Sequence, residues 1–314
     1  MLLTVSVFTA LMIDFIVGEP RRWHPLVGFG NVANWLESKL NKAANKSIFL
    51  SRLAGLIGWA LLVLPLVILL FCVMQEGLST EIEFVFGVIC LTFAVGTKSL
   101  MQHAKAVADA VKQSDLILAR KKIAMIVSRD TSNSDEEAIN TATIESVLEN
   151  GSDAIFAAIF WFAVLGAPGV VLYRLANTLD AMWGYRTERF NSFGWAAARI
   201  DDVLNWLPAR LTALSYALAG NIRSALSCWQ KQARHWHGIN PGVVMATGAG
   251  ALNIKLGGAA MYHGEMVERP ELGCDKTPQV TDIDRAIHLV YKSIFIWLLL
   301  IALVEYFLGD YFIV

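Results

Sequence analysis

The 314-residue sequence carries little charge for its length and lacks the motifs of soluble nucleotide-binding enzymes. Charged residues make up 17% of the chain, whereas soluble domains usually carry roughly 25%. The net charge of -1 leaves no basic footprint of the kind that nucleic acid binding requires. No P-loop, GxGxxG, GxSxG or HExxH pattern is present in the sequence, so any ATP site is not of the Walker type.

Cysteines are few and are not spaced for metal binding. The four cysteines show no CxxC pair, and Cys72 and Cys90 lie within apolar runs. We therefore expect buried thiols at these positions rather than a disulfide or a zinc site. The apolar N-terminal run lacks a basic region and a small-residue cleavage site, so we expect it to be retained.

The sequence is rich in long apolar runs. Hydrophobic residues make up 55% of the chain and the mean hydropathy is +0.50, values typical of an integral membrane protein. A helix needs about 20 apolar residues to span a bilayer, so we expect an all-α polytopic protein with about four to six spanning helices. The candidate segments are Leu2–Val17, Leu53–Met74, Ile82–Thr97, Ala154–Ala176, Leu204–Gly220, Val243–Ala260 and Ser293–Leu308.

The distribution of Lys and Arg predicts one integral membrane domain, 1–314, with cytoplasmic loops at 19–52, 102–153 and 221–290. This orientation creates a conflict, because a full span at Ala154–Ala176 would place the polar stretch Asn177–Val203 outside. The Gly166–Gly169 sequence and Pro208 offer a solution, since broken or re-entrant helices are tolerated where they line a polar cavity. We therefore predict that these two segments are broken or re-entrant and that the cytoplasmic loops are helical.

The stretch from Arg129 to Arg210 combines membrane-length apolar runs with many charged side chains. Ionisable groups near hydrocarbon are costly, which favours a functional use for them. Glu145 and Glu149 lie four residues apart on one helix face, and Asp153 lies one turn further. Carboxylates of this kind hold magnesium together with substrate phosphates, and the alternative is a solvated helix face.

Two more groups of polar residues flank the following apolar segments. Asn177, Asp180 and Arg186 come first, and Arg199, Asp201, Asp202 and Arg210 come later. Arginines bind phosphate and carboxylate with two parallel hydrogen bonds, which indicates an anionic substrate. The alternative is interhelical ion pairing, such as Arg199 with Asp202 or Asp201 with Arg210. His24 lies between two prolines near the membrane surface and is either a base or a structural turn residue.

Several of these motifs together resemble one known family. They are Asp14-xxx-Gly18-Glu19-Pro20-xxx-His24-Pro25, Arg129-Asp130-Thr131, Ile144-Glu145-Ser146-xx-Glu149-Asn150-xx-Asp153, Asn177-Thr178-Leu179-Asp180, Phe193–Asn205 and Pro208-Ala209-Arg210-Leu211-Thr212. In this order they resemble the CobD/CbiB group of adenosylcobinamide-phosphate synthases. The resemblance implies a bacterial inner-membrane enzyme that joins adenosylcobyric acid to (R)-1-amino-2-propanol O-phosphate or ethanolamine phosphate, with ATP consumed and magnesium required.

The implied amide synthesis gives the candidate residues their roles. Forming an amide from a carboxylate needs an activated acyl group, most simply an acyl phosphate made from ATP. We predict three groups of site residues: metal ligands Glu145, Glu149, Asp153, Asp201 and Asp202; substrate and phosphate ligands Arg129, Asn177, Arg186, Arg210 and Asn240; and catalytic residues Asp180, His24 and Arg199. The expected partners are the corrinoid, the amino-alcohol phosphate and membrane lipid, with a homo-oligomer or an association with other enzymes of the pathway left open.

A departure from the family pattern near Met245 and two alternative functions also have to be considered. The family usually has an acidic residue after its Asn-Ala-Gly segment, and this chain has Met245 in that region. A non-enzymatic, AmpE-like membrane signalling protein has a similar architecture, but such proteins lose much of the acidic constellation that this chain keeps. A transporter would explain broken helices, yet no inverted repeat is visible in the sequence.

Overall fold

The computed structural model describes residues 2–18, 25–44, 47–185, 187–262 and 264–309. The chain divides into two compact units, each made of segments that are far apart in the sequence. Unit 1 consists of Met1–Val95, Ala157–Asn205 and Val304–Val314, and unit 2 of Gly96–Phe156 and Trp206–Leu303. Two long helices, α9 (Trp195–Ala219) and α12 (Val280–Leu308), begin in one unit and end in the other.

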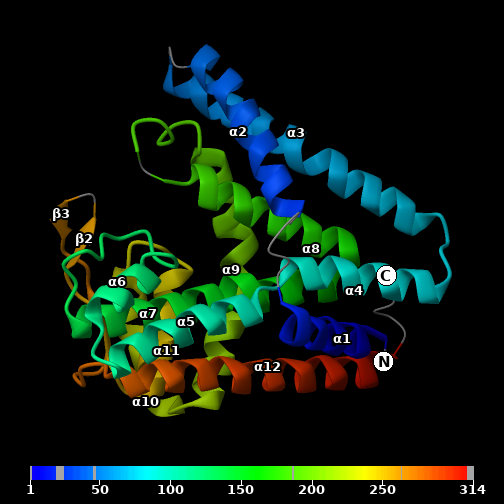
Figure 1. The fold of residues 1–314 in the computed structure, drawn as a ribbon. Coiled ribbons are helices and arrows are strands. Elements are labelled where there is room, and N and C mark those ends of the chain that lie inside the picture. The colour runs from blue at the N-terminus through cyan, green and yellow to red at the C-terminus, as the bar shows by residue number, and fades with distance from the viewer. Residues whose placement is uncertain (1, 19–24, 45–46, 186, 263, 310–314) are drawn as a thin grey trace. The chain divides into compact units, whose positions relative to one another are not determined.

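Unit 1 is built almost entirely from apolar helices. These are α1 (Leu2–Val17), α2 (Pro25–Ala44), α3 (Ile48–Gln75), α4 (Thr80–Ala94) and α8 (Ala157–Trp183) (Figure 1). A core of large side chains joins α3 and α8 to the segment before α9, where the rings of Trp183 and Phe193 meet edge to face with centroids 5.1 Å apart. The ring of Trp59 on α3 is buried in the same core.

Unit 2 combines shorter helices with two small antiparallel ribbons. Its helices are α5 (Thr97–Lys112), α6 (Leu116–Ile123), α7 (Glu136–Gly151), a π-helical turn (Ser152–Phe156), α10 (Ile222–Gln232), a 3-10 turn (Ala233–His235) and α11 (Pro241–Leu252). Strand β1 (Lys255–Gly257) pairs with β4 (Glu271–Gly273), and β2 (Ala260–Tyr262) pairs with β3 (Glu265–Val267). In Figure 1 the helices α5, α6 and α7 lie side by side, and a cluster that includes Val107, Ile123 and Ile139 fills the space between them.

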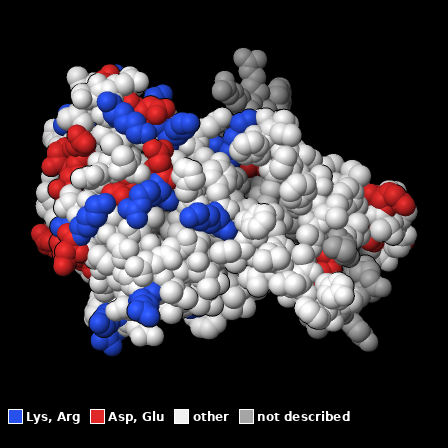
Figure 2. Space-filling model, turned by 90° about the horizontal axis from the view of Figure 1, so that it is seen from below, with Lys and Arg blue, Asp and Glu red and all other residues white. Residues whose placement is uncertain are grey.

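Four helical stretches are long and apolar enough to cross a membrane, which confirms the expected all-α, polytopic class. They are Ile48–Gln75, Thr80–Lys112, Glu136–Trp183 and Val280–Phe307. Only 17% of the most apolar window of the first is buried within the protein, so its outward face is suited to lipid. Figure 2 likewise shows broad uncharged areas between the places where charged side chains gather. The ribbons of unit 2 are the exception to the all-α prediction.

The structure confirms one predicted helix break and corrects the other. Gly166 adopts a left-handed φ of 62° inside α8, so this helix is broken where the Gly166–Gly169 sequence predicts it. The break expected at Pro208 is wrong, because Pro208 lies within the continuous helix α9. The apolar segment Val243–Ala260 is not one continuous helix either, since α11 ends at Leu252 and strands follow.

The cysteine prediction holds in part. All four thiols are free, as expected, but Cys72 is exposed rather than buried in the protein. It lies on α3, whose outer face is apolar, so the apolar run around it reflects a lipid-facing surface and not a protein core.

The backbone of Gly194 in unit 1 lies so close to that of Trp183 that adding a single methyl group there should strongly destabilise the fold. A Cβ atom added to Gly194 would lie 1.7 Å from the carbonyl oxygen of Trp183, which cannot move without disturbing the end of α8. We expect Gly194→Ala to lower the free energy of unfolding by about 3 kcal/mol. Gly28→Ala on α2 is the matched control, because nothing lies within 4 Å of its added Cβ. Thermal unfolding in detergent tests this, and equal unfolding temperatures for both variants would contradict it.

Candidate functional site

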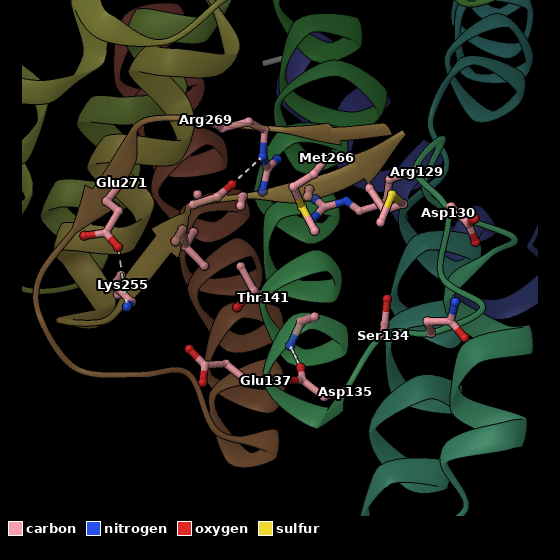
Figure 3. A pocket seen from close by; sticks show the side chains of 18 of the residues that line it. Arg129, Asp130, Ser134, Asp135, Glu137, Thr141, Lys255, Met266, Arg269 and Glu271 are labelled. Atoms are coloured by element: carbon pink, nitrogen blue, oxygen red, sulfur yellow. Dashed lines mark hydrogen bonds and ion pairs between the residues drawn. The ribbon is translucent and has the colours of Figure 1, made fainter. Parts of the chain in front are cut away.

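The main pocket of unit 2 has a volume of about 490 Å³ and lies between the Arg129–Asp135 loop, the first turns of α7 and the two ribbons. Figure 3 shows Arg129 and Arg269 at one end of it, with Asp135, Glu137 and Thr141 of the α7 region at the other. The lining is mixed in charge: basic Arg129, Lys255 and Arg269, and acidic Asp130, Asp135, Glu137 and Glu271. It is therefore suited to a ligand that carries both anionic and cationic groups.

Local hydrogen bonds fix the loop that forms one wall of this pocket. The side chain of Asp130 accepts from the backbone N–H and the hydroxyl of Ser132 at 2.9 and 2.7 Å, which closes a tight turn and lowers the pKa of this carboxyl. The Asp130 N–H donates to the Met261 carbonyl at 2.9 Å and ties the loop to β2. Asp135 then caps α7 by accepting from the Ala138 N–H at 2.8 Å.

An arginine–carboxylate cluster, defined by Arg129, Glu145 and Arg269, lies at the inner end of the pocket. Arg129 donates to Oε2 of Glu145, and Arg269 donates to both carboxylate oxygens at 3.1 and 3.2 Å. The N–H of Gly257 donates to Oε1 at 2.8 Å. The side chain of Glu145 is only 3% exposed, so one buried carboxylate orients two guanidinium groups that come from different parts of the chain.

The guanidinium of Arg269 is also held from a second side. The Arg269 Nε donates to the Gly258 carbonyl at 3.0 Å, and its charged group lies 5.2 Å from the centre of the Trp236 ring. Gly257 has a φ of +80°, and an added Cβ would lie 2.1 Å from the Pro270 carbonyl, so the ribbon can approach Glu145 only with glycine there. Both guanidinium groups share the carboxylate of Glu145 and also line the pocket, where they can bind an anion such as phosphate.

Glu149 and Asp153 continue the same helical run. Glu149 is half-buried and lies close enough to Glu145, Arg129 and Arg269 to interact with their charges. Asp153 lies in the π-helical turn, within electrostatic reach of the buried Tyr216. In the part of the chain that the structure describes, no three His, Cys, Asp or Glu side chains form a metal-binding group. The metal roles of Glu145, Glu149, Asp153, Asp201 and Asp202 stay predictions.

Arg210 and Asn240, both predicted to bind substrate, are in contact. The Nη1 of Arg210 donates to Oδ1 of Asn240 at 2.8 Å and to the carbonyl of Trp206 at 2.8 Å. The guanidinium also lies 4.5 Å from the centre of the Trp206 ring. Asn240 is the residue before the first turn of α11, so this bond links α9 to the start of α11.

Because they are in contact, Arg210 and Asn240 should act as one unit. We expect Arg210→Lys to lower activity, since a point charge lacks the planar fork that bonds two acceptors at once. Asn240→Ala should lower it to a similar extent, and the double variant should be no worse than either single variant. Arg223→Lys on the exposed face of α10 is the control. Fully additive losses in a growth or turnover assay would show that the two residues act independently.

A buried polar network in unit 1 collects other predicted residues. Asp201 accepts from the side-chain amides of Asn177 at 3.3 Å and Asn205 at 2.9 Å, and Asn205 accepts from the Tyr173 hydroxyl at 3.0 Å. Burial raises the pKa of Asp201 to about 6, although the two amide hydrogen bonds oppose the shift. The predicted ion pair of Arg199 with Asp202 is present at 3.2 Å and is exposed. The alternative pair of Asp201 with Arg210 is not formed.

The remaining predicted residues are placed only in part. The side chain of Asp180 lies against Gly184, where an added Cβ would come within 2.1 Å of the carboxylate. His24 and Arg186 lie outside the described residues. Arg269 and Lys255 were missing from the predicted site, although Gly257-Gly258 and Arg269-Pro270 are visible in the sequence as turn-forming pairs beside charged residues.

Comparisons with known proteins show which family the chain belongs to. Residues 7–290 match the family model described as CobD/Cbib protein. A cobalamin biosynthesis protein CobD from Stutzerimonas stutzeri is 54% identical over 95% of this chain and 96% of its own length. CobD proteins from Chromobacterium violaceum and Mycobacterium tuberculosis strain H37Rv are 53% and 35% identical, over 92% and 91% of this chain and 92% and 90% of their own lengths. No solved structure matches. The chain therefore belongs to the CobD/CbiB family of cobalamin biosynthesis proteins.

Proposed function

We propose that this protein joins adenosylcobyric acid to (R)-1-amino-2-propanol O-phosphate, or to ethanolamine phosphate, in an ATP-dependent reaction that forms an amide. The observation that supports this most directly is the arginine–carboxylate cluster at the inner end of the pocket. Family membership supports a step of cobalamin biosynthesis, and the positive charge directed at the pocket suits a phosphorylated substrate. The acidic residues of the opposite wall suit the ammonium group of the same substrate.

The chemistry needs two steps. A carboxylate oxygen of the corrinoid attacks the γ-phosphorus of ATP, which gives an acyl phosphate and ADP. The amine nitrogen then attacks the acyl carbon, the bond to the phosphate oxygen breaks, and the amine loses a proton. A carboxylate or an imidazole can accept such a proton, and Asp180 and His24 stay the sequence-based predictions for this role. The net reaction consumes one ATP and releases ADP and phosphate.

Arg129 and Arg269 are proposed to stabilise the phosphoryl group during these steps. Preorganised cations lower the energy of a transition state when they need no rearrangement as charge develops. The hydrogen bonds of Glu145 and of the Gly258 carbonyl supply that preorganisation. Glu145 is thus a positioning residue in this proposal, since its oxygens already accept from two arginines and from the Gly257 N–H.

Magnesium is proposed to accompany ATP. It is usually held by one or two carboxylates together with substrate phosphates, so a dedicated cage of three is not needed. Glu149 fits this requirement, because among the described residues its carboxylate makes no hydrogen bond or ion pair and it lies one turn from Glu145. When bound, the ion would neutralise the charge of the triphosphate.

Complementation tests the proposed reaction. A strain that lacks this biosynthetic step and carries the protein should grow when supplied with cobyric acid, and also when supplied with cobinamide. The strain without the protein should grow only on cobinamide. If the complemented strain grew on cobinamide but not on cobyric acid, the proposed enzyme activity would be rejected.

We also infer that the pocket opens to the cytoplasm, where ATP is present. Both of its sides come from the loops 102–153 and 221–290, which the positive-inside rule places there. In a chain whose native cysteines are replaced by serine, a membrane-impermeant thiol reagent added from outside should label Ser79→Cys and spare Lys112→Cys. The reverse pattern would overturn this orientation.

A further inference from the structure

A second recess in unit 2, with a volume of about 200 Å³, lies where the ends of α9 and α11 meet the first half of α12. Its small side chains come from the helix ends, including Gly220 and Ala251. An added Cβ at Gly220 would lie 2.7 Å from the Ala251 Cβ, so the two helix ends approach closely. The rest of the lining comes from α12 and includes three basic residues, Arg285, His288 and Lys292.

The three basic residues lie on one face of α12, because they are spaced by three and four positions. Arg285 is held in place: it donates to Asp282 at 2.5 Å and to the Leu252 carbonyl at 2.7 Å. The Nδ1 of His288 donates to the Asp284 carbonyl at 2.7 Å, since a carbonyl can only accept. Its second ring nitrogen is left for another partner.

The charge of Lys292 is not balanced nearby. Asp284 pairs with Lys112 at 2.7 Å, and Asp282 pairs with Arg285 at 2.5 Å and with Lys276 at 3.5 Å. In the described ranges no carboxylate lies within 4 Å of the Lys292 ammonium group, and the residue is exposed. Among the described residues, the recess therefore keeps the positive charge of Lys292, which no carboxylate neutralises, beside Arg285, which is paired with Asp282.

This positive lining is directly followed by a membrane-spanning surface. The apolar run of α12 begins at Ser293, one residue after Lys292, and belongs to a helix apolar enough to cross a membrane. Phe295 and Leu299, three and seven residues after Lys292 and so on the same face, are 72% and 54% exposed. Leu218, at the end of α9 beside the recess, is 60% exposed. Cations above exposed apolar side chains match a lipid with an anionic headgroup.

We propose that this recess binds the phosphodiester headgroup of an anionic membrane lipid, whose acyl chains cover the exposed side chains of Phe295 and Leu299. The basic end of α12 is predicted to face the cytoplasm, and the cytoplasmic leaflet is the one that carries negative surface charge. A free phosphate would contact the same basic side chains but would not cover the exposed apolar side chains of Phe295 and Leu299. The site shares no lining residue with the main pocket, so its test is independent of the amide-forming activity.

Lipid retention tests the proposal. The full-length protein is extracted with mild detergent from vesicles of equal amounts of phosphatidylcholine and phosphatidylglycerol, and the retained lipid is counted by mass spectrometry. We expect the wild type to retain phosphatidylglycerol preferentially and Lys292→Gln to retain about fivefold less, because one cation near an anionic surface is lost. Lys121→Gln, on the exposed face of α6, is the control and should retain as much as the wild type.

Thermal unfolding separates lipid binding from a folding defect. Wild type and Lys292→Gln should unfold at the same temperature in phosphatidylcholine, and added phosphatidylglycerol should stabilise the wild type more than the variant. Equal retention of both lipids by the wild type, or an equal loss in Lys121→Gln, would overturn the proposal. Displacement of the lipid by inorganic phosphate alone would also overturn it and would indicate a free-anion site.

Discussion

Replacing Glu145 by glutamine should lower the free energy of unfolding by about 3–5 kcal/mol and abolish growth on cobyric acid. The reason is that Arg129 and Arg269, whose side chains are 12% and 6% exposed, would lose their shared counter-charge. Removing one partner of a buried ion pair leaves an uncompensated charge that is strongly destabilising. Arg269→Lys keeps the charge but cannot hold both oxygens of Glu145 together with the Gly258 carbonyl, so activity should fall about a hundredfold.

The control for this experiment lies at the rim of the same pocket. Glu271 pairs with Lys255 at 3.6 Å, and its side chain is 68% exposed. An exposed ion pair contributes about 1 kcal/mol or less, so Glu271→Gln should unfold at nearly the wild-type temperature. Thermal unfolding in detergent and growth on cobyric acid are measured for all variants. A Glu145→Gln protein as stable as Glu271→Gln would show that the arginine–carboxylate cluster does not organise this region.

Glu149→Gln should lower turnover about a hundredfold while the amount of protein in the membrane stays near the wild-type level. Unlike Glu145, this carboxylate holds no arginine in place through a hydrogen bond among the described residues, so its loss should affect function more than stability. Glu136→Gln, one of the exposed acidic residues in the first turn of α7, is the matched control.

Added magnesium distinguishes a metal role of Glu149 from a purely electrostatic one. If Glu149 helps to hold magnesium, the variant should regain part of its activity as the magnesium concentration rises, because a weakened site fills at higher metal concentration. The control variant should show the same magnesium dependence as the wild type. Unchanged turnover of Glu149→Gln would remove this residue from the proposed site.

Much of the architecture was predictable because the signals are local. The apolar run of α3 determines its length, Asp135 followed by Glu136 and Glu137 marks the start of α7, and Gly166 breaks α8. Pro208 misled the prediction, since a proline lacks one N–H but a long helix can continue through it. The local sequence shows that a backbone N–H donor is missing at a proline. It does not show whether packing against neighbouring helices keeps the helix intact.

The candidate site was predicted less completely because it depends on contacts between distant segments. Glu145 is 124 residues from Arg269, and a single sequence gives no sign that the two side chains meet. The pairing of β1 with β4 brings Gly257 and Arg269 to Glu145, and three-residue strands carry too little periodicity to be recognised. Met245, the expected departure from the family pattern, is buried in α11, where apolar packing suits it.

Direct assay of the purified protein tests the central claim. Full-length protein in detergent is incubated with adenosylcobyric acid, (R)-1-amino-2-propanol O-phosphate or ethanolamine phosphate, ATP and magnesium, and the corrinoid is followed by mass spectrometry. The proposed reaction predicts a product whose mass is the sum of the corrinoid and the amine phosphate less one water, with ADP and phosphate formed in equal amounts. A folded protein that forms no such product from either amine, while the 54%-identical relative from Stutzerimonas stutzeri does so under the same conditions, would contradict the proposed function.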